Sequence, residues 1–318
     1  MEGFLGDIAV RNKTVTKVFT RRKLTILAAG VAVIAAGGWV AVLLSADSAD
    51  FKASPPGYTI AKDIQYSYTL RNKTNRVIDQ AEFWAHAPVK QTANQLCQEL
   101  TANYPFQLNT DPYGNQVLHF TFEKLAPYAS RVITIKAKLM VSRAANSIAA
   151  EPETSDLLPE KHIESDHPAI RRLAGKLRES DGMATIKATF DWVASQVRYS
   201  GYAARDRGAL YALQHKKGDC TEYMDLFVAL SRANGRPARR VGGYLCPQNA
   251  VLKARDYHNW GVFYEDGTWQ IADPQNNVLM QNQEDYIAMR LIRASQDDPL
   301  GTANRFRVKG EGLTARMN

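Results

Sequence analysis

Cys220, His258 and Asp273 are the residues of this sequence whose types and settings could together attack a carbonyl group. Cys220 follows Gly218-Asp219 and precedes a nearly all-apolar run, so we expect it in the first turn of a buried helix capped by Asp219. The dipole and the free N–H groups at a helix N-terminus favour a thiolate over a thiol. Cys220 is therefore a candidate nucleophile.

His258 and Asp273 occupy the two ends of a predicted hairpin. His258 begins one apolar run, Asp273 ends the next, and the Asp266-Gly267 pair between the runs is a strong turn signal. Adjacent antiparallel strands can hold an imidazole beside a carboxylate, and a helix tip facing them can bring a thiol to that imidazole. This pattern predicts thiol acyl transfer, in which an amide or peptide carbonyl forms a thioester and releases an amine.

Three blocks of sequence surround these residues: Gly218-Asp219-Cys220-Thr221-Glu222-Tyr223; Arg232-Ala233-Asn234-Gly235-Arg236-Pro237-Ala238-Arg239 with Gly242-Gly243-Tyr244; and His258-Asn259-Trp260 with Gly267-Thr268-Trp269 and Asp273-Pro274. In this order, over about residues 160–280, they resemble the transglutaminase-like superfamily in its compact prokaryotic form. The resemblance implies a papain-like α/β core. It also implies Cys220 as nucleophile, His258 as general base and acid, and Asp273 as orienter.

Further residues are expected to complete the site. The Cys220 N–H is one predicted donor to the oxyanion, and the second donor is left open among three upstream side chains: Gln214, Tyr199 and Trp192. Trp260 and Trp269 are predicted either to wall the cleft or to fill the core beneath the hairpin, and Tyr244 is a further cleft candidate. His215 is close to Cys220 in sequence but lies in a polar stretch, so we expect it to be solvated.

The sequence contains no motif for a cofactor or a metal ion. The three cysteines show no CxxC spacing, and we expect Cys97 and Cys246 to be separate free thiols. His86 and His119 lie in predicted strands without partner ligands. There is no EF-hand loop and no glycine-rich phosphate loop.

The predicted architecture is α+β, with a papain-like transglutaminase core, residues 155–295, preceded by a small all-β domain, residues 58–145. In the latter the apolar residues Ile64, Tyr66, Tyr68 and Leu70 alternate with polar ones, and several such runs favour an immunoglobulin-like sandwich. Residues 91–104 read as helix or loop, residues 284–292 as a helix, and residues 296–318 as a polar tail with little periodicity.

The N-terminal part is predicted to anchor the chain in a membrane. Residues 1–23 form a basic tail, residues 24–46 contain no charge and can cross a bilayer as a helix, and residues 47–57 form a linker. Arg21-Arg22-Lys23 precedes the span, so the N-terminus is expected in the cytoplasm and the catalytic domain outside it. A cleaved signal peptide and a buried soluble helix are the alternatives.

Composition limits the function classes. The 318 residues carry a net charge of +8, but the excess is dispersed and no aromatic-interleaved basic patch occurs, so we expect no nucleic-acid partner. The leading hypothesis is a cysteine protease or amidase that acts on a protein or peptide substrate. The alternatives are a transglutaminase-type cross-linker or acyltransferase, and a non-enzymatic binding or assembly protein of the cell envelope.

Overall fold

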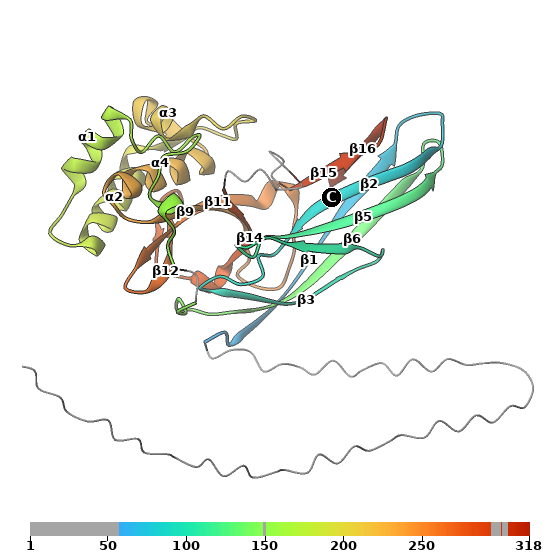
Figure 1. Cartoon of the computed structure of the whole chain (residues 1–318), viewed down its shortest axis with the longest axis horizontal. Helices are drawn as coiled ribbons and strands as arrows, with labels where there is room; N and C mark the ends of the chain where they lie inside the picture. Colours follow the sequence, from blue (N-terminus) through green and yellow to red (C-terminus); the bar gives the residue numbers. More distant parts are fainter. Residues whose placement is uncertain (1–56, 149–150, 294–299, 301–304) are drawn as a thin grey trace, which may run out of the picture. The chain divides into compact units, whose positions relative to one another are not determined.

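A computed structural model describes residues 57–148, 151–293, 300 and 305–318, all of which belong to one compact unit (Figure 1). The predicted basic tail and membrane span lie outside these residues. Within the described part of the chain, no helix is both long and apolar enough to cross a membrane.

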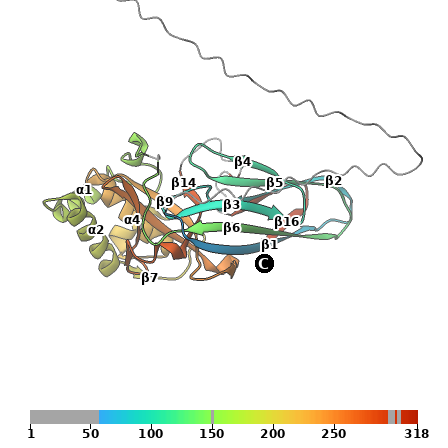
Figure 2. The ribbon, with the colours of Figure 1, turned by 90° about the horizontal axis from the view of Figure 1, so that it is seen from below.

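The β-domain consists of two sheets that share one core. Figure 2 shows them as two layers, with β1, β3 and β6 in one and β2, β4 and β5 in the other. Alternate side chains of β1, such as Tyr66, Tyr68 and Leu70, pack inward against Phe83 and Phe120. The immunoglobulin-like topology stays a prediction. The strands are β1 (Ile60–Asn72), β2 (Ile78–Ala87), β3 (Gln95–Ala102), β4 (Gln107–Thr110), β5 (Gln116–Leu125) and β6 (Ser130–Val141).

The C-terminal residues complete this domain, which corrects the prediction of a polar tail. β15 (Phe306–Lys309) pairs with β2, and β16 (Leu313–Met317) pairs with β1. The short strand β10 (Ala250–Val251) also joins β1. Both C-terminal strands are short and carry polar residues on one face, so they show little periodicity in the sequence. Their pairing partners lie more than 200 residues earlier in the chain.

The core sheet has the strand order β13-β12-β11-β9-β14. Its strands are β9 (Ala238–Leu245), β11 (Tyr257–Glu265), β12 (Thr268–Asp273), β13 (Val278–Leu279) and β14 (Tyr286–Ile292). β14 corrects the helix predicted for residues 284–292. That stretch is a nearly continuous apolar run, which suits a buried strand as well as a helix, and pairing with β9 decides between them.

Four helices gather beside the core sheet (Figure 1): α1 (Pro168–Leu177), α2 (Gly182–Gln196), α3 (Gly208–His215) and α4 (Cys220–Ala233). α4 packs against β9 and β11 and is surrounded by the other three helices, so most of its residues are buried. A Cβ atom at Gly261 would lie 2.7 Å from the Phe227 ring. Glycine at this position therefore lets α4 approach the sheet closely.

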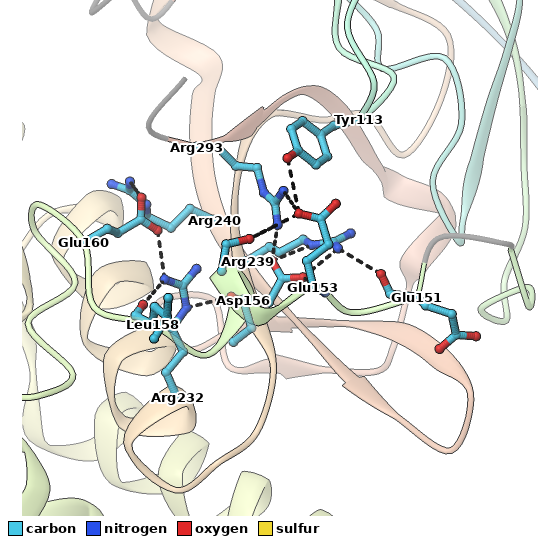
Figure 3. Close-up of polar contacts among 12 residues, drawn as sticks. Tyr113, Glu151, Glu153, Asp156, Leu158, Glu160, Arg232, Arg239, Arg240 and Arg293 are labelled. Atoms are coloured by element: carbon cyan, nitrogen blue, oxygen red, sulfur yellow. Dashed lines mark hydrogen bonds and ion pairs between the residues drawn. The ribbon is translucent and has the colours of Figure 1, made fainter. Parts of the chain in front are cut away.

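A buried ionic network holds the segment between the two domains (Figure 3). Asp156, which follows the domain junction, accepts hydrogen bonds from Arg239 at 2.9 and 2.7 Å and also pairs with Arg293. Glu160 pairs with Arg232 and Arg240, each at 2.9 Å. These contacts fix residues 153–160 onto β9, α4 and the end of β14.

Candidate active site

Cys220 is the first residue of α4, as the sequence predicts. A capping box defines this start: the Asp219 side chain accepts from the Thr221 N–H at 2.9 Å, and the Glu222 side chain accepts from the Asp219 N–H at 2.9 Å. Cys220 itself is half-buried. Its N–H lies in the first turn, where a helix leaves donors without an intrahelical partner.

The core sheet brings His258 and Asp273 together. His258 lies at the start of β11 and Asp273 at the end of β12, and the His258 Nε2 atom is 2.7 Å from the Asp273 Oδ2 atom. Both side chains are buried, with 8% and 1% of their surface exposed. Cys220 also acts on His258, because it contributes to raising the pKa of the imidazole.

The charge balance of this group favours an imidazolium. Burial alone would lower the pKa of His258, but the hydrogen bonds and charges of Asp273 and Cys220 outweigh it and raise the pKa to about 9. His258 is therefore expected to carry its positive charge near neutral pH. A positive charge beside a thiol stabilises the thiolate form.

A side-chain bond joins the tip of α4 to the strand that carries His258. The Asn259 amide donates to the Thr221 hydroxyl at 3.0 Å. Thr221 follows Cys220 and Asn259 follows His258, so this bond fixes the two neighbours of the reactive residues relative to each other. The role of Asn259 and Thr221 was not evident from the sequence, because nothing local relates residues 38 positions apart.

Two further residues contact Asp273 and were missed by the sequence reasoning. The Asn276 amide donates to Asp273 Oδ2 at 2.8 Å and lies 3.2 Å from His258 Nε2. The Tyr286 hydroxyl donates to the same oxygen at 2.9 Å. Asn276 lies three residues after Asp273 in a loop, which is a weak signal, and Tyr286 fell in a stretch predicted as helix.

The sequence model of the Transglutaminase-like superfamily matches residues 171–274, which include α4, the hairpin and all three candidate residues. Residues 171–274 are a transglutaminase-like domain. Over 117 residues the chain is also 28% identical to an uncharacterised protein of Mycobacterium leprae; the match covers 35% of this chain and 41% of that protein. The chain thus spans less than half of that relative's length.

One solved structure shows a related fold. A candidate cysteine protease from Cytophaga hutchinsonii superposes with a TM-score of 0.55 at 17% identity, over 81% of this chain and 90% of that chain. The periplasmic domain of TgpA from Pseudomonas aeruginosa has a TM-score of 0.37 at 16% identity, over 67% and 92% of the two chains. The first of these comparisons shows that the fold is shared.

The predicted cleft aromatics of the transglutaminase-like domain lie in different places. Trp260 is buried; its ring is 6.3 Å from that of His258 at an angle of 20°, and it lines a cavity of about 650 Å³ together with Trp269. Tyr244 instead packs in the core shared with the β-domain, where its hydroxyl contacts the Met317 sulfur at 3.3 Å. Tyr244 is thus a core residue, and its place in the cleft stays a prediction.

The three candidates for the second oxyanion donor lie on elements that precede α4 in the chain. Tyr199, on β7 (Arg198–Tyr199), is 60% exposed and pairs with Gly218 on β8 (Lys217–Gly218). Gln214 is exposed on α3. The Trp192 ring is covered by the Lys216 ammonium at 3.6 Å. None of these placements tests a contact with a bound carbonyl, so the second donor stays a prediction.

The other thiols differ from Cys220. Cys97 and Cys246 are free and buried, and burial raises the pKa of each to about 11. Among the described residues no group of His, Cys, Asp and Glu side chains is arranged to hold a metal ion. Cys220, by contrast, is only half-buried.

The titration of His258 tests the electrostatics of the site. We expect its imidazole resonance to titrate near pH 9, and both Cys220→Ala and Asp273→Asn to lower that midpoint, because each removes an acceptor that stabilises the cation. The folded-state pKa lies above the ordinary value, so this stabilisation is complete below about pH 6.5 and is lost as the pH rises through about 9. Histidine-selective NMR measures the midpoint, and a midpoint unchanged in both variants would contradict the assignment.

Proposed function

We propose that the protein is a thiol acyl-transfer enzyme that cleaves amide or peptide bonds through a Cys220-His258-Asp273 triad. The observation that supports this proposal is the His258–Asp273 pair, in which Nε2 faces the buried carboxylate at 2.7 Å. A half-buried cysteine at a helix N-terminus acts on the same imidazole and contributes to raising its pKa. A transglutaminase-like domain with the fold of a candidate cysteine protease is consistent with this chemistry.

In the proposed reaction the Cys220 thiolate attacks the substrate carbonyl carbon. The oxyanion that develops faces the Cys220 N–H, a donor at the start of α4. Because Nε2 is bonded to Asp273, His258 Nδ1 is the nitrogen left to exchange a proton with the reacting groups. It gives this proton to the leaving amine as the C–N bond breaks, and a thioester remains on Cys220.

Water is the proposed acceptor of the acyl group. Neutral His258 takes a proton from water, the hydroxyl adds to the thioester, and the C–S bond breaks to give a carboxylic acid and the thiolate. We favour hydrolysis because water is the default nucleophile in an open site. A primary amine in place of water would give the transglutaminase reaction, and the experiment below distinguishes the two.

The experiment combines alkylation with trapping of the intermediate. In the purified full chain, iodoacetamide near neutral pH is expected to modify Cys220 much faster than a free thiol, with the buried Cys97 and Cys246 as internal controls. Incubation with cell-envelope extract followed by rapid acid quenching is expected to leave an acyl group on Cys220, identified by mass. Adding a primary amine tests transfer. If Cys220 reacts no faster than a free thiol and carries no acyl group, the proposal is wrong.

We also propose that residues 24–46 anchor the enzyme in a membrane with its reactive site on the extracytoplasmic side. The support is the uncharged run itself and the basic residues before it. A topology reporter fused after Asn318 is expected to be active outside the cytoplasm. Cytoplasmic reporter activity would overturn the proposed orientation.

A further inference from the structure

β14 is the edge strand of the core sheet, and the β-domain hydrogen-bonds its outer edge. The Gln95 side chain bonds both backbone groups of Ala288, at 2.8 Å to the N–H and 3.1 Å to the carbonyl oxygen, and the Val89 N–H bonds the same carbonyl at 2.8 Å. Further along, the Asn115 side chain bonds the N–H and carbonyl of Leu291 at 2.7 and 3.1 Å. The polar groups of this edge are thus satisfied by the β-domain.

The same domain also holds the first residue of β14. The buried Asn94 amide donates to the Gln283 carbonyl at 2.6 Å and to the Tyr286 carbonyl at 3.1 Å. Asn94 and Gln95, which we call the amide clamp, therefore fix the backbone from residue 283 to residue 288. The position of Tyr286 depends on side chains of the β-domain that lie about 190 residues earlier in the sequence.

The Tyr286 side chain reaches from this fixed backbone to the reactive group. Its hydroxyl donates at 2.9 Å to Asp273 Oδ2, the oxygen that His258 Nε2 contacts at 2.7 Å. Its buried ring packs edge-on against Trp260 at 5.1 Å, and the Trp260 ring in turn lies nearly parallel to His258. Burial, reinforced by the negative charge of Asp273, raises the pKa of Tyr286, so the phenol keeps its proton and stays a donor.

We propose that Tyr286 is a positioning residue through which the β-domain holds the Asp273–His258 pair in its reactive geometry. This inference rests on the proposed function. A carboxylate that accepts a hydrogen bond from only one partner can rotate about its side-chain bonds. A second donor on a rigid strand restricts this rotation, so the carboxylate keeps the orientation in which it binds the imidazole. The amide clamp supplies that rigidity, which gives the β-domain a role in the chemistry beyond that of a spacer.

The test removes the hydroxyl and keeps the ring. In Tyr286→Phe we expect the alkylation rate of Cys220 by iodoacetamide at pH 7 to fall about 3- to 10-fold, the effect of losing one hydrogen bond of ordinary net strength. The downfield Nε2 proton resonance of His258 is expected to shift upfield. Asn94→Ala is expected to lower the rate by about 2- to 5-fold, but to add less than about 1.5-fold in the Tyr286→Phe background, because both act through one contact.

Asn115→Ala is the matched control. It removes an amide that hydrogen-bonds the same edge of β14 at Leu291, five residues beyond Tyr286. We therefore expect it to lower the unfolding midpoint about as much as Asn94→Ala does. It should leave the alkylation rate and the His258 resonance unchanged. A change equal to that of Asn94→Ala would mean that loosening β14 anywhere has this effect, and would overturn the specific role of Tyr286.

Two outcomes separate this inference from the proposed function. If wild-type Cys220 reacts fast but Tyr286→Phe changes neither the alkylation rate nor the His258 resonance, the inference is wrong and the proposed function stands. If wild-type Cys220 reacts no faster than a free thiol and carries no acyl group, the proposed function fails, and this inference fails with it. If the effects of Asn94→Ala and Tyr286→Phe on the alkylation rate are additive, the amide clamp does not act through Tyr286, and the inference is wrong.

Discussion

Replacing Cys220 with alanine is expected to abolish turnover, lowering kcat by about 10⁵- to 10⁶-fold, since the variant has no atom that can form the thioester. Cys220 is half-buried at the helix start, and alanine is a good helix former, so the fold should be retained. The measurement is the rate of amine release from the acyl donor recovered by the trapping experiment, with circular dichroism as the check on folding.

His258→Ala is the companion variant for this prediction. Members of a triad act as a unit, so its loss should be nearly as large, and the double variant should be little worse than either single one. Cys97→Ala is the matched control, because that cysteine is buried in the β-domain core and should affect stability but not turnover. Residual turnover within about 100-fold of wild type in Cys220→Ala would assign the chemistry to another group.

Replacing Asp156 with alanine is expected to lower the free energy of unfolding by about 3–5 kcal/mol. Asp156 has none of its surface exposed, and it pairs with the largely buried Arg239 and with Arg293 (Figure 3). Removing it leaves the buried Arg239 guanidinium without its carboxylate, whereas Arg293 keeps its ion pair with Glu153. Urea unfolding of the purified chain measures the difference.

The same carboxylate makes the stability depend on pH. Burial alone would raise the pKa of Asp156, but hydrogen bonds from Arg239 and the Glu153 N–H, together with the charges of Arg239 and Arg293, lower it below its ordinary value. The unfolded chain then binds the proton more readily, so the stabilisation is present above the ordinary aspartate pKa and is lost as the pH falls through the folded-state value. In Asp156→Ala, the free energy of unfolding should therefore decrease less than in the wild type as the pH falls.

Glu311→Ala serves as the control for the Asp156 prediction. Its pair with Arg76 is exposed, with 89% and 72% of the two side chains accessible, and such pairs contribute about 0–1 kcal/mol. If Asp156→Ala lowers the free energy of unfolding no more than Glu311→Ala does, the buried network does not hold residues 153–160 in place, and the argument from burial is wrong.

Some features of this protein follow from the sequence because their causes are local. The start of α4 at Cys220 is set by Asp219 and by Glu222 three residues later, which satisfy the first-turn donors of the helix. The hairpin of β11 and β12 follows from the Asp266-Gly267 turn, where both residues adopt positive φ. Because helix start and hairpin register are local, the three reactive residues could be named before their distances were known.

Other features were decided only by contacts between distant parts of the chain. Residues 284–292 are apolar enough to form either a helix or a strand, and only pairing with β9 and the side-chain amides of the β-domain select the strand. The C-terminal strands are equally ambiguous, because each is stable only when paired to β1 or β2.

In the candidate site, too, some features follow from local sequence and others from contacts between distant residues. The sequence by itself predicted a helix start at Cys220 and a hairpin with His258 and Asp273 at its two ends, because a cap and a tight turn are local signals. Only the tertiary structure decided that Tyr286 and Asn276 hold Asp273. The physical reason is that a hydrogen bond to the carboxylate leaves no period, turn or cap in the sequence, and it forms only once the β-domain has fixed the strand that carries Tyr286.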